Sequence, residues 1–176
     1  MRKTFLILVL FLNMTTHLLA QSGEPEVING YTLPPEPDTA VNNSTLLGID
    51  FNNNGIRDDV ERKVIITYQT PIKIALMMSY AKLGQEILAN PIGLAMEHSD
   101  KGTRISNCKM YLRRQNIKIE NAIEFFENNT FNTKQRVRAY LDHNIALSGG
   151  VYGSSINERN AQACDFDVEQ MLKDIK

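Results

Sequence analysis

Apolar residues recur every three or four positions along most of the chain after residue 58, which is the spacing of one face of an α-helix. The segments with this pattern are 59–70, 71–90, 91–98, 103–115, 119–127, 132–147 and 163–175. Gly102 falls between the third and fourth segments and is expected to interrupt them. Alternation of polar and apolar residues is nowhere long enough for a sheet. The pattern therefore predicts the all-α class: a single-domain helical bundle of about five to seven helices, over residues 50–176.

Polar and glycine residues mark the ends of the sixth helical segment. Asn132, with Gln135 three residues later, resembles a capping box and is expected to begin this helix. Ser148, Gly149 and Gly150 are expected to end it, because glycine is common just beyond the last helical turn.

Residues 21–49 precede the helices and are rich in proline and turn-forming residues. The prolines are Pro25, Pro34, Pro35 and Pro37. Since proline lacks a backbone N–H and restricts the residue before it, we expect no helix in this region and interpret it as an extended arm. The Asn29-Gly30 pair is expected to join Val27-Ile28 and Tyr31-Thr32 in a very small hairpin.

The first 20 residues have the layout of a secretory signal peptide. Arg2 and Lys3 precede an unbroken apolar run at 5–12, and Ala20 provides a small residue for cleavage. This run is far shorter than the roughly 20 residues needed to cross a bilayer. We therefore expect an exported protein, periplasmic or secreted, without a permanent membrane span. A buried N-terminal helix is the alternative interpretation.

Composition and charge limit the classes of partner. The 176 residues include 19 basic and 20 acidic side chains, a net charge of −1. Removal of residues 1–20 takes away two basic residues, which leaves 17 against 20 and a net charge of −3. The chain offers no strong basic field, so nucleic-acid binding by phosphate neutralisation is not expected.

Export changes the interpretation of the two cysteines, Cys108 and Cys164. An oxidising compartment favours their pairing, and neither has a CxxC partner or a nearby histidine. The bridge would close a loop of roughly 57 residues and contribute about 4 kcal/mol of stability on the chain-entropy model. We expect a structural disulfide rather than a catalytic thiol.

Residues 50–61 (DFNNNGIRDDVE) carry oxygen-bearing side chains at their first, third, fifth, ninth and twelfth positions, and glycine at the sixth. Ca²⁺ prefers six to eight oxygen ligands, and this spacing wraps a loop around one ion. Gly55 permits a sharp reversal of the backbone. Ile56 would supply its backbone carbonyl, Asp58 would bind directly or through water, and Glu61 would bind with both carboxylate oxygens. The expected ligands are Asp50, Asn52, Asn54, Ile56, Asp58 and Glu61.

These residues match the pattern D-x-[DN]-x-[DN]-G-x₅-E, and the stretch resembles an EF-hand-type calcium loop. Two features depart from that family. Arg57 occupies the eighth position, where an aliphatic residue is usual, and the proline-rich arm stands in place of an entering helix. The loop is therefore more similar to the dockerin-like variant, here as a single loop followed by one helix. More loosely, residues 33–37 and 46–62 resemble a group of uncharacterised exported bacterial proteins, which implies no activity.

The same loop residues have a simpler interpretation. Asn53, Asn54 and Gly55 form a good turn, and Asp58 with Glu61 three residues later would cap a helix. Capping alone does not explain why Asp50 and Asn52 also fall in register. With only three charged ligands, the loop is expected to bind Ca²⁺ with a dissociation constant of about 10⁻⁴–10⁻³ M, as in extracellular modules.

Motifs that would indicate an enzyme are weak. Ser79 and Lys82 have serine–lysine spacing, but they fall within a helix and no companion motif accompanies them. His98 and His143 each follow an acidic residue, and neither belongs to an HExxH motif, so each is expected to be an exposed helix residue. No phosphate-binding glycine loop or nucleophile elbow is present.

Together these patterns indicate an exported helical protein with one structural Ca²⁺, acting as a binding or accessory module with a protein or cell-envelope partner. One alternative is an exported hydrolase, or an accessory of one, that uses scattered carboxylates. It would be favoured by a pocket that gathers two or more acids with raised pKa values. A second alternative is a structural envelope protein that binds no metal.

Overall fold

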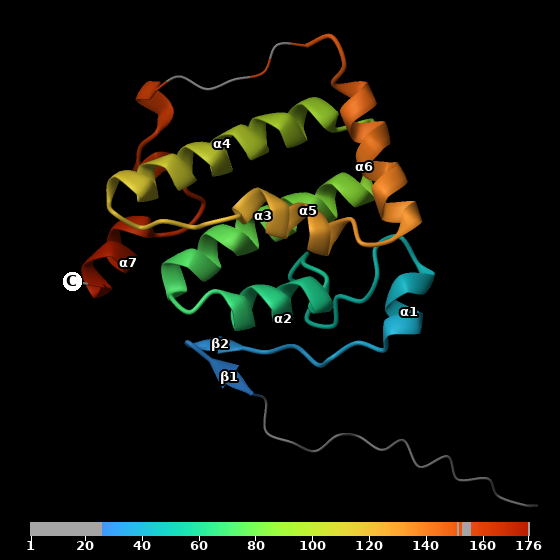
Figure 1. Ribbon diagram of the computed structural model, residues 1–176, viewed down its shortest axis with the longest axis horizontal. Coiled ribbons are helices and arrows are strands. Elements are labelled where there is room, and N and C mark those ends of the chain that lie inside the picture. The colour runs from blue at the N-terminus through green and yellow to red at the C-terminus, as the bar shows by residue number, and fades with distance from the viewer. Residues whose placement is uncertain (1–25, 151, 153–155, 176) are drawn as a thin grey trace, which may run out of the picture.

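The computed structural model describes residues 26–150, 152 and 156–175, so the expected signal peptide at 1–20 and residues 21–25 lie outside the described part of the chain. The described residues form seven α-helices, two short 3₁₀ helices and one two-stranded hairpin, which confirms the all-α prediction (Figure 1). In chain order the elements are β1 Val27–Ile28, β2 Tyr31–Thr32, α1 Thr39–Ser44, α2 Asp58–Thr67, α3 Pro71–Ala89, α4 Ala95–Arg114, α5 Ala122–Thr130, α6 Lys134–Ala146, η1 Ile156–Glu158, η2 Ala161–Ala163 and α7 Val168–Asp174.

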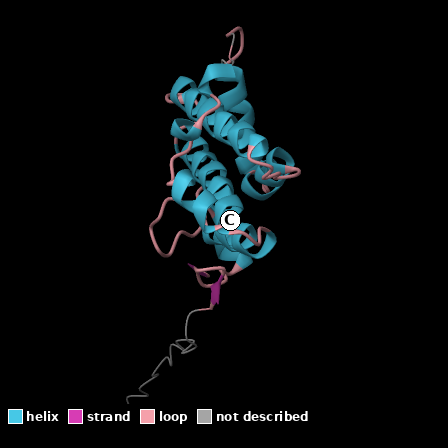
Figure 2. Cartoon of the chain, turned by 90° about the vertical axis from the view of Figure 1, so that its left-hand side faces the viewer, coloured by secondary structure: helices cyan, strands magenta, loops and turns pink. Residues whose placement is uncertain are grey.

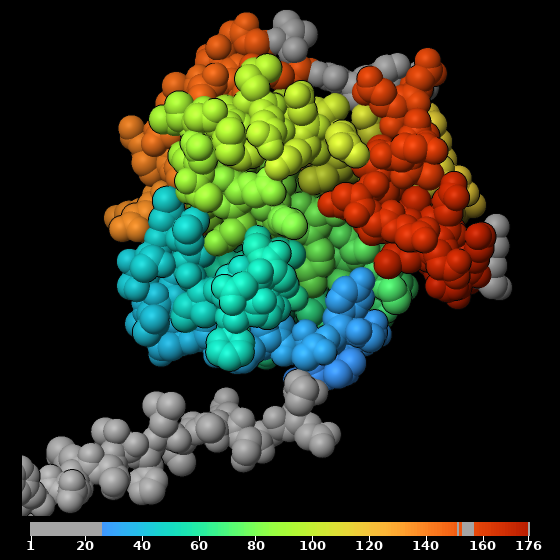
Figure 3. All heavy atoms as spheres, turned by 180° about the vertical axis from the view of Figure 1, so that it is seen from behind, coloured from blue at the N-terminus to red at the C-terminus, as the bar shows by residue number. Residues whose placement is uncertain are grey.

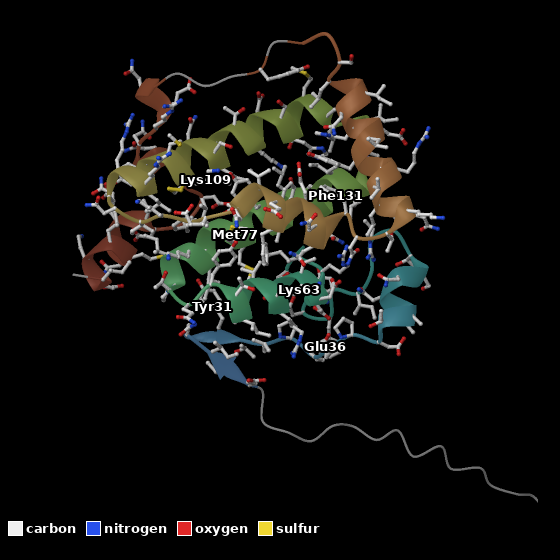
Figure 4. The ribbon with its side chains drawn as sticks, in the orientation of Figure 1. Tyr31, Glu36, Lys63, Met77, Lys109 and Phe131 are labelled. Carbon is white, nitrogen blue, oxygen red and sulfur yellow. A yellow bond between two sulfur atoms is a disulfide. The ribbon has the colours of Figure 1, made fainter. Side chains whose placement is uncertain are left out.

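Helix α3 is the central element, and α2, α4, α5, α6 and α7 all pack against it. Pro71 lies in its first turn, where the missing N–H would have no helical partner in any case. Buried side chains follow on every side, including Ile72, Ile74 and Leu76, and a helix that is apolar all round belongs in a core. Met77 is 1% exposed and lies in the interior of the bundle in Figure 4.

Helix α4 is one continuous helix where the sequence suggested two. The chain at 91–94 forms a turn, and the helix then runs through Gly102 without a break. A Cβ at Gly102 would lie 3.4 Å from Leu83 Cδ2, an ordinary van der Waals distance, so the packing of α4 on α3 does not require glycine at this position. Burial of Ile105 and Leu112 on the same helix offsets the roughly 1 kcal/mol by which glycine disfavours a helix.

The arm contains a helix that the sequence analysis did not predict. Pro37 is its last proline, so the residues that follow are free to become helical. Asp38 caps α1 by accepting a hydrogen bond from the Val41 N–H at 2.9 Å. The expectation that no helix occurs between residues 21 and 49 is therefore wrong at Thr39–Ser44.

The hairpin at the start of the arm is confirmed. Val27 pairs with Thr32 and Ile28 with Tyr31 in antiparallel register. The Tyr31 hydroxyl donates a hydrogen bond to the carbonyl oxygen of Pro71, 3.3 Å away, and this contact holds the hairpin against the start of α3. Viewed from the side in Figure 2, the hairpin lies at one end of the helical layer.

The start of α6 also differs from expectation. Thr133, rather than Asn132, caps this helix by accepting a hydrogen bond from the Arg136 N–H at 3.3 Å. The side chain of Asn132 cannot fill that role because its oxygen accepts hydrogen bonds from Arg57 and Arg136. The end of the helix before the glycines is confirmed, and Gly149 follows with a φ of +88°.

The predicted disulfide is confirmed. Cys108 on α4 is bonded to Cys164, directly after η2, with an S–S distance of 2.01 Å. The expected seventh helix begins later than predicted, because residues 161–163 form the short helix η2 and α7 starts at Val168. The disulfide therefore attaches an irregular segment, rather than the last helix itself, to α4. No helix in the described part of the chain combines the length and apolarity needed to cross a membrane.

Candidate metal centre

The predicted calcium loop connects the arm to α2. Its backbone turns sharply at Asn53, with a φ of 55°, and at Gly55, with a φ of +82°. The Asp58 N–H donates to the Ile49 carbonyl oxygen at 2.8 Å, which closes the base of the loop. The glycine is required at Gly55 because a positive φ of this size is unfavourable for residues with a Cβ.

The first, third and fifth positions direct their oxygens at backbone N–H groups of the loop. The Asp50 carboxylate accepts from the N–H groups of Asn54 and Gly55 at 3.2 and 2.8 Å. The amide oxygen of Asn52 accepts from the Asn54 N–H at 3.1 Å, and that of Asn54 from the Ile56 N–H at 2.9 Å. These bonds fix the loop in a shape that keeps three oxygen-bearing side chains together.

Glu61, at the twelfth position, closes the loop from the first turns of α2. The amide nitrogens of Asn52 and Asn54 donate to the same carboxylate oxygen of Glu61, at 3.1 and 3.0 Å. The third, fifth and twelfth positions are thus brought together. The amide groups present their positive ends to Glu61, and a cation would take over that role with the amide oxygens turned towards it.

Asp58 and Glu61 are buried carboxyl groups, 1% and 6% exposed, and neither forms a salt bridge with a described residue. The Phe51 N–H donates to both oxygens of Asp58, at 3.1 and 3.2 Å. Burial raises the pKa of both carboxyl groups, and the nearby charge of Asp50 raises both further. Hydrogen bonds stabilise both carboxylates, and the nearby charge of Arg62 partly offsets that of Asp58.

Ile56 anchors the loop through its side chain. It is 6% exposed and packs with Val60 and Ala81 in a small cluster separate from the main core. This contact fixes the seventh position of the loop against α2 and α3. Its backbone carbonyl is the group that the sequence analysis assigned to Ca²⁺.

Arg57 explains the unusual eighth position of the loop. Its side chain is fully buried and forms an ion pair with Asp59. The guanidinium also donates to the carbonyl oxygens of Asn129 and Thr130, at 2.8 and 3.2 Å, at the end of α5. Where paired EF-hand-type loops would contact one another, this loop is instead fastened to the helical bundle.

A second buried arginine, Arg136 on α6, completes this anchor. It donates to the carbonyl oxygens of Asn42, Thr45 and Leu46 at 2.6, 3.3 and 3.0 Å, in and just after α1. Burial, together with the nearby charge of Arg57, lowers the pKa of Arg136 to about 10. The burial of Arg57 and Arg136 was not expected from the sequence, because nothing in the spacing of a single arginine shows that it is buried.

The loop offers oxygen atoms, rather than a cluster of acids or histidines, to a metal ion. Within residues 26–150, 152 and 156–175, no group of three or more His, Cys, Asp or Glu side chains is placed to hold one. The donor set of the loop is instead mixed: three carboxylates, two amides and one backbone carbonyl. All of these are oxygen donors of the kind that Ca²⁺ prefers, although the two amides contact Glu61 through their nitrogens while their oxygens accept backbone N–H groups.

The two helical histidines are buried rather than exposed, so that expectation is wrong. His98 and His143 are 2% and 5% exposed, and their ring centres lie 5.6 Å apart where α4 meets α6. Burial lowers the pKa of both, and for His98 the neighbouring His143 lowers it further. Glu97 and Asp142, the acids that precede the two histidines in the chain, form ion pairs with Lys101 and Arg138. An acidic neighbour in the sequence therefore does not show whether a histidine is exposed.

Ser79 and Lys82 do not form a serine–lysine pair with a described hydrogen bond. The Ser79 hydroxyl instead donates to the Asp165 carboxylate at 2.5 Å and contacts the Ala75 carbonyl oxygen at 3.2 Å. This arrangement ties α3 to the segment after the disulfide.

Comparisons with known proteins leave the family open. No protein-family model matches the chain, and no curated protein or solved structure shows significant similarity to it.

Proposed function

We propose that this is an exported helical protein that binds one structural Ca²⁺ ion at residues 50–61 and acts as a binding or accessory module of the cell envelope. The observation that carries the proposal is Glu61. This carboxylate is almost fully buried, has no salt-bridge partner in the described chain, and is contacted by the amides of Asn52 and Asn54. A buried charge is stable only when paired, hydrogen-bonded or bound to a metal.

In this proposal the ion joins the loop to α2. Asp50, Asn52 and Asn54 supply one oxygen each from the loop, and Ile56 supplies its carbonyl. Glu61 supplies both carboxylate oxygens from α2, with Asp58 binding directly or through water. Calcium would neutralise the buried carboxylates. Because the affinity expected for three charged ligands is about 10⁻⁴–10⁻³ M, the ion serves stability rather than cytosolic signalling.

Two features support export. The first 20 residues have the order of a signal peptide. The disulfide between Cys108 and Cys164 is of the kind that persists in an oxidising compartment. Extracellular fluids also contain calcium at concentrations that suit a site of modest affinity.

Thermal unfolding of the mature, oxidised protein tests the proposal. The midpoint is measured in about 2 mM Ca²⁺ and in a chelator, where an ion that binds only the folded state raises stability. Asp50→Ala is expected to abolish the rise, whereas the matched variant Asp100→Ala, an acid on the surface of α4 away from the loop, is expected to keep it. A midpoint that does not respond to calcium in the wild-type protein would reduce residues 50–61 to a turn and a helix start.

A further inference from the structure

A cavity of about 250 Å³ lies between α3, α4 and the segment that follows the disulfide. Its floor is apolar and includes Leu83, Ile105 and the buried Cys108. Figure 3 shows this face of the molecule, where the red C-terminal segment borders green α3 and yellow α4. At roughly 30 Å³ for each water-sized group, the cavity has room for about eight such groups.

The polar lining of the cavity carries an excess of positive charge. Three cationic side chains, Lys82, Lys101 and Arg104, face two carboxylates. Lys101 is already paired, because it contacts Glu86 at 2.8 Å and Glu97 at 3.0 Å. Lys82 on α3 and Arg104 on α4 form no salt bridge with any described residue. These two cations are available to an anionic ligand.

The second carboxylate of the cavity, Asp165, is also occupied. It accepts the short hydrogen bond from the Ser79 hydroxyl, which holds residue 165 against α3. Ala163 forms part of the wall, and the adjacent Cys164 is fixed to α4 by the disulfide. The wall that closes the cavity is therefore attached at both of its sides, so the cavity is a built feature rather than a gap beside a loose chain end.

We propose that this cavity binds a small organic anion with an apolar chain, of the size and class of a short-chain carboxylate. The anionic group is held by Lys82 and Arg104 through charge-assisted hydrogen bonds. The apolar chain is buried on the floor formed by Leu83 and Ile105. Neutral or cationic molecules of the same shape lack the partner that these two side chains require.

The proposal goes beyond the calcium site and does not rest on it. Lys82 lies close to the calcium loop, since a Cβ at Gly55 would be 3.6 Å from Lys82 Cε. None of the expected calcium ligands lines the cavity itself. Anion binding is therefore expected in the presence of a chelator as well as in calcium, and in Glu61→Gln as well as in the wild-type protein.

Hexanoate is the probe, because its carboxylate and five-carbon tail match the cavity in size. It is titrated into the isotope-labelled mature protein while backbone amide shifts are followed by nuclear magnetic resonance. Saturable shifts are expected at Ser79, Lys82, Ile105 and Ala163. Hexanamide, which has the same shape without the charge, and hexylammonium, which carries the opposite charge, are expected to bind at least about tenfold more weakly.

Variants distinguish the two cations from a general attraction of the surface. Lys82→Met and Arg104→Met are each expected to weaken hexanoate binding by about tenfold, the loss of one charge-assisted hydrogen bond. Lys109→Met removes a cation of α4 that does not line the cavity, and it is expected to leave binding unchanged. Ala163→Leu fills the cavity and is expected to abolish binding of hexanoate.

Several results would overturn the proposal: shifts that do not saturate, equal affinity for hexanoate and hexanamide, or equal affinity in Lys82→Met, Arg104→Met and the wild-type protein. Lys82 and Arg104 are exposed, so their replacement is expected to preserve the fold, and circular dichroism checks this. If the unfolding midpoint of the wild-type protein does not respond to calcium while hexanoate still binds, the calcium site alone is refuted.

Discussion

Glu61→Gln separates a calcium site from a helix start most sharply, because the two interpretations predict different responses of its stability to calcium. Glutamine keeps the shape of glutamate and its oxygen accepts the hydrogen bonds from Asn52 and Asn54. It removes the buried negative charge and with it the bidentate anionic ligand at the twelfth position of the loop. The variant therefore changes one ligand while the packing around α2 stays the same.

In a chelator, Glu61→Gln is expected to be as stable as the wild-type protein or up to about 1 kcal/mol more stable. The reason is that burial raises the pKa of Glu61, so the ionised form at neutral pH is disfavoured in the folded state. The hydrogen bonds that glutamine retains are weaker than those to a carboxylate, which limits the gain.

In calcium the wild-type protein gains stability that the variant lacks, and the order reverses where this gain exceeds the advantage of the variant in chelator. At about 2 mM Ca²⁺ the wild-type protein gains about 1.8 kcal/mol if the dissociation constant is about 10⁻⁴ M, and about 0.7 kcal/mol if it is about 10⁻³ M. For a chain of this size the larger value corresponds to a rise of about 4–7 °C in the unfolding midpoint. Glu61→Gln is expected to show almost no rise.

The assay is urea unfolding followed by circular dichroism, for both proteins, with calcium and with chelator. A crossing of the two stability curves as calcium is added supports the site. Parallel responses of wild-type protein and variant would refute the reasoning, since calcium would then act without Glu61. A variant that is much less stable in chelator would show that Glu61 is needed for the helix start instead.

Three further predictions follow from the buried polar groups and the crosslink. Arg57→Met leaves Asp59 and two carbonyl groups without their partner and is expected to lower the free energy of unfolding by about 3–5 kcal/mol. The control, Arg138→Met, breaks an exposed ion pair and is expected to lower this free energy by at most about 0.5 kcal/mol. Both values are measured by urea unfolding. Reduction of the disulfide is expected to lower the free energy of unfolding by about 4 kcal/mol, measured with and without reductant. Burial lowers the pKa of His98 and His143, so their contribution to the free energy of unfolding is complete above pH 6.5. As the pH falls below 6.5, this free energy is expected to decline by at most about 1.4 kcal/mol per pH unit for each histidine. His98→Leu is expected to reduce this slope between pH 7.5 and 5.5.

The features best predicted from the sequence are those that depend on apolar periodicity and on local turn residues. The apolar spacing located helices at the positions of α2 and α3, and the proline at residue 71 marked the boundary between them. Export, inferred from the first residues, led to the correct pairing of Cys108 with Cys164. These signals are local or compartmental, so a single sequence is enough to carry them.

The sequence analysis was wrong where tertiary contacts decide the outcome. Gly102 lies inside a helix because α4 packs along α3 and buries Ile105 and Leu112, a long-range contact that no local pattern reveals. His98 and His143 are buried because α4 meets α6, although each has a charged neighbour in the chain. Asn132 caps nothing because two arginines bind its side chain.

The two buried arginines give the candidate metal loop its place in the molecule. Arg57 lies within the loop and fastens it to the end of α5, while Arg136 on α6 holds the chain just before the loop. Gly48 lies between them, with a φ of +70°, and a Cβ there would overlap Arg57 Cδ. Both arginines donate hydrogen bonds to backbone carbonyl oxygens, and Arg57 also pairs with Asp59, so the loop is fixed on both sides.

This arrangement determines what an ion at the loop would stabilise. The flanks are already held by the arginines, so calcium has little effect to exert on the position of the loop as a whole. What remains without a salt bridge is the buried negative charge of Asp58 and Glu61, which only the nearby Arg62 offsets in part at Asp58, since the two arginines bond to Asp59 and to carbonyl groups instead. A cation would offset this charge, and its stabilisation should therefore vanish when the buried charge is removed, even though the loop keeps its anchors.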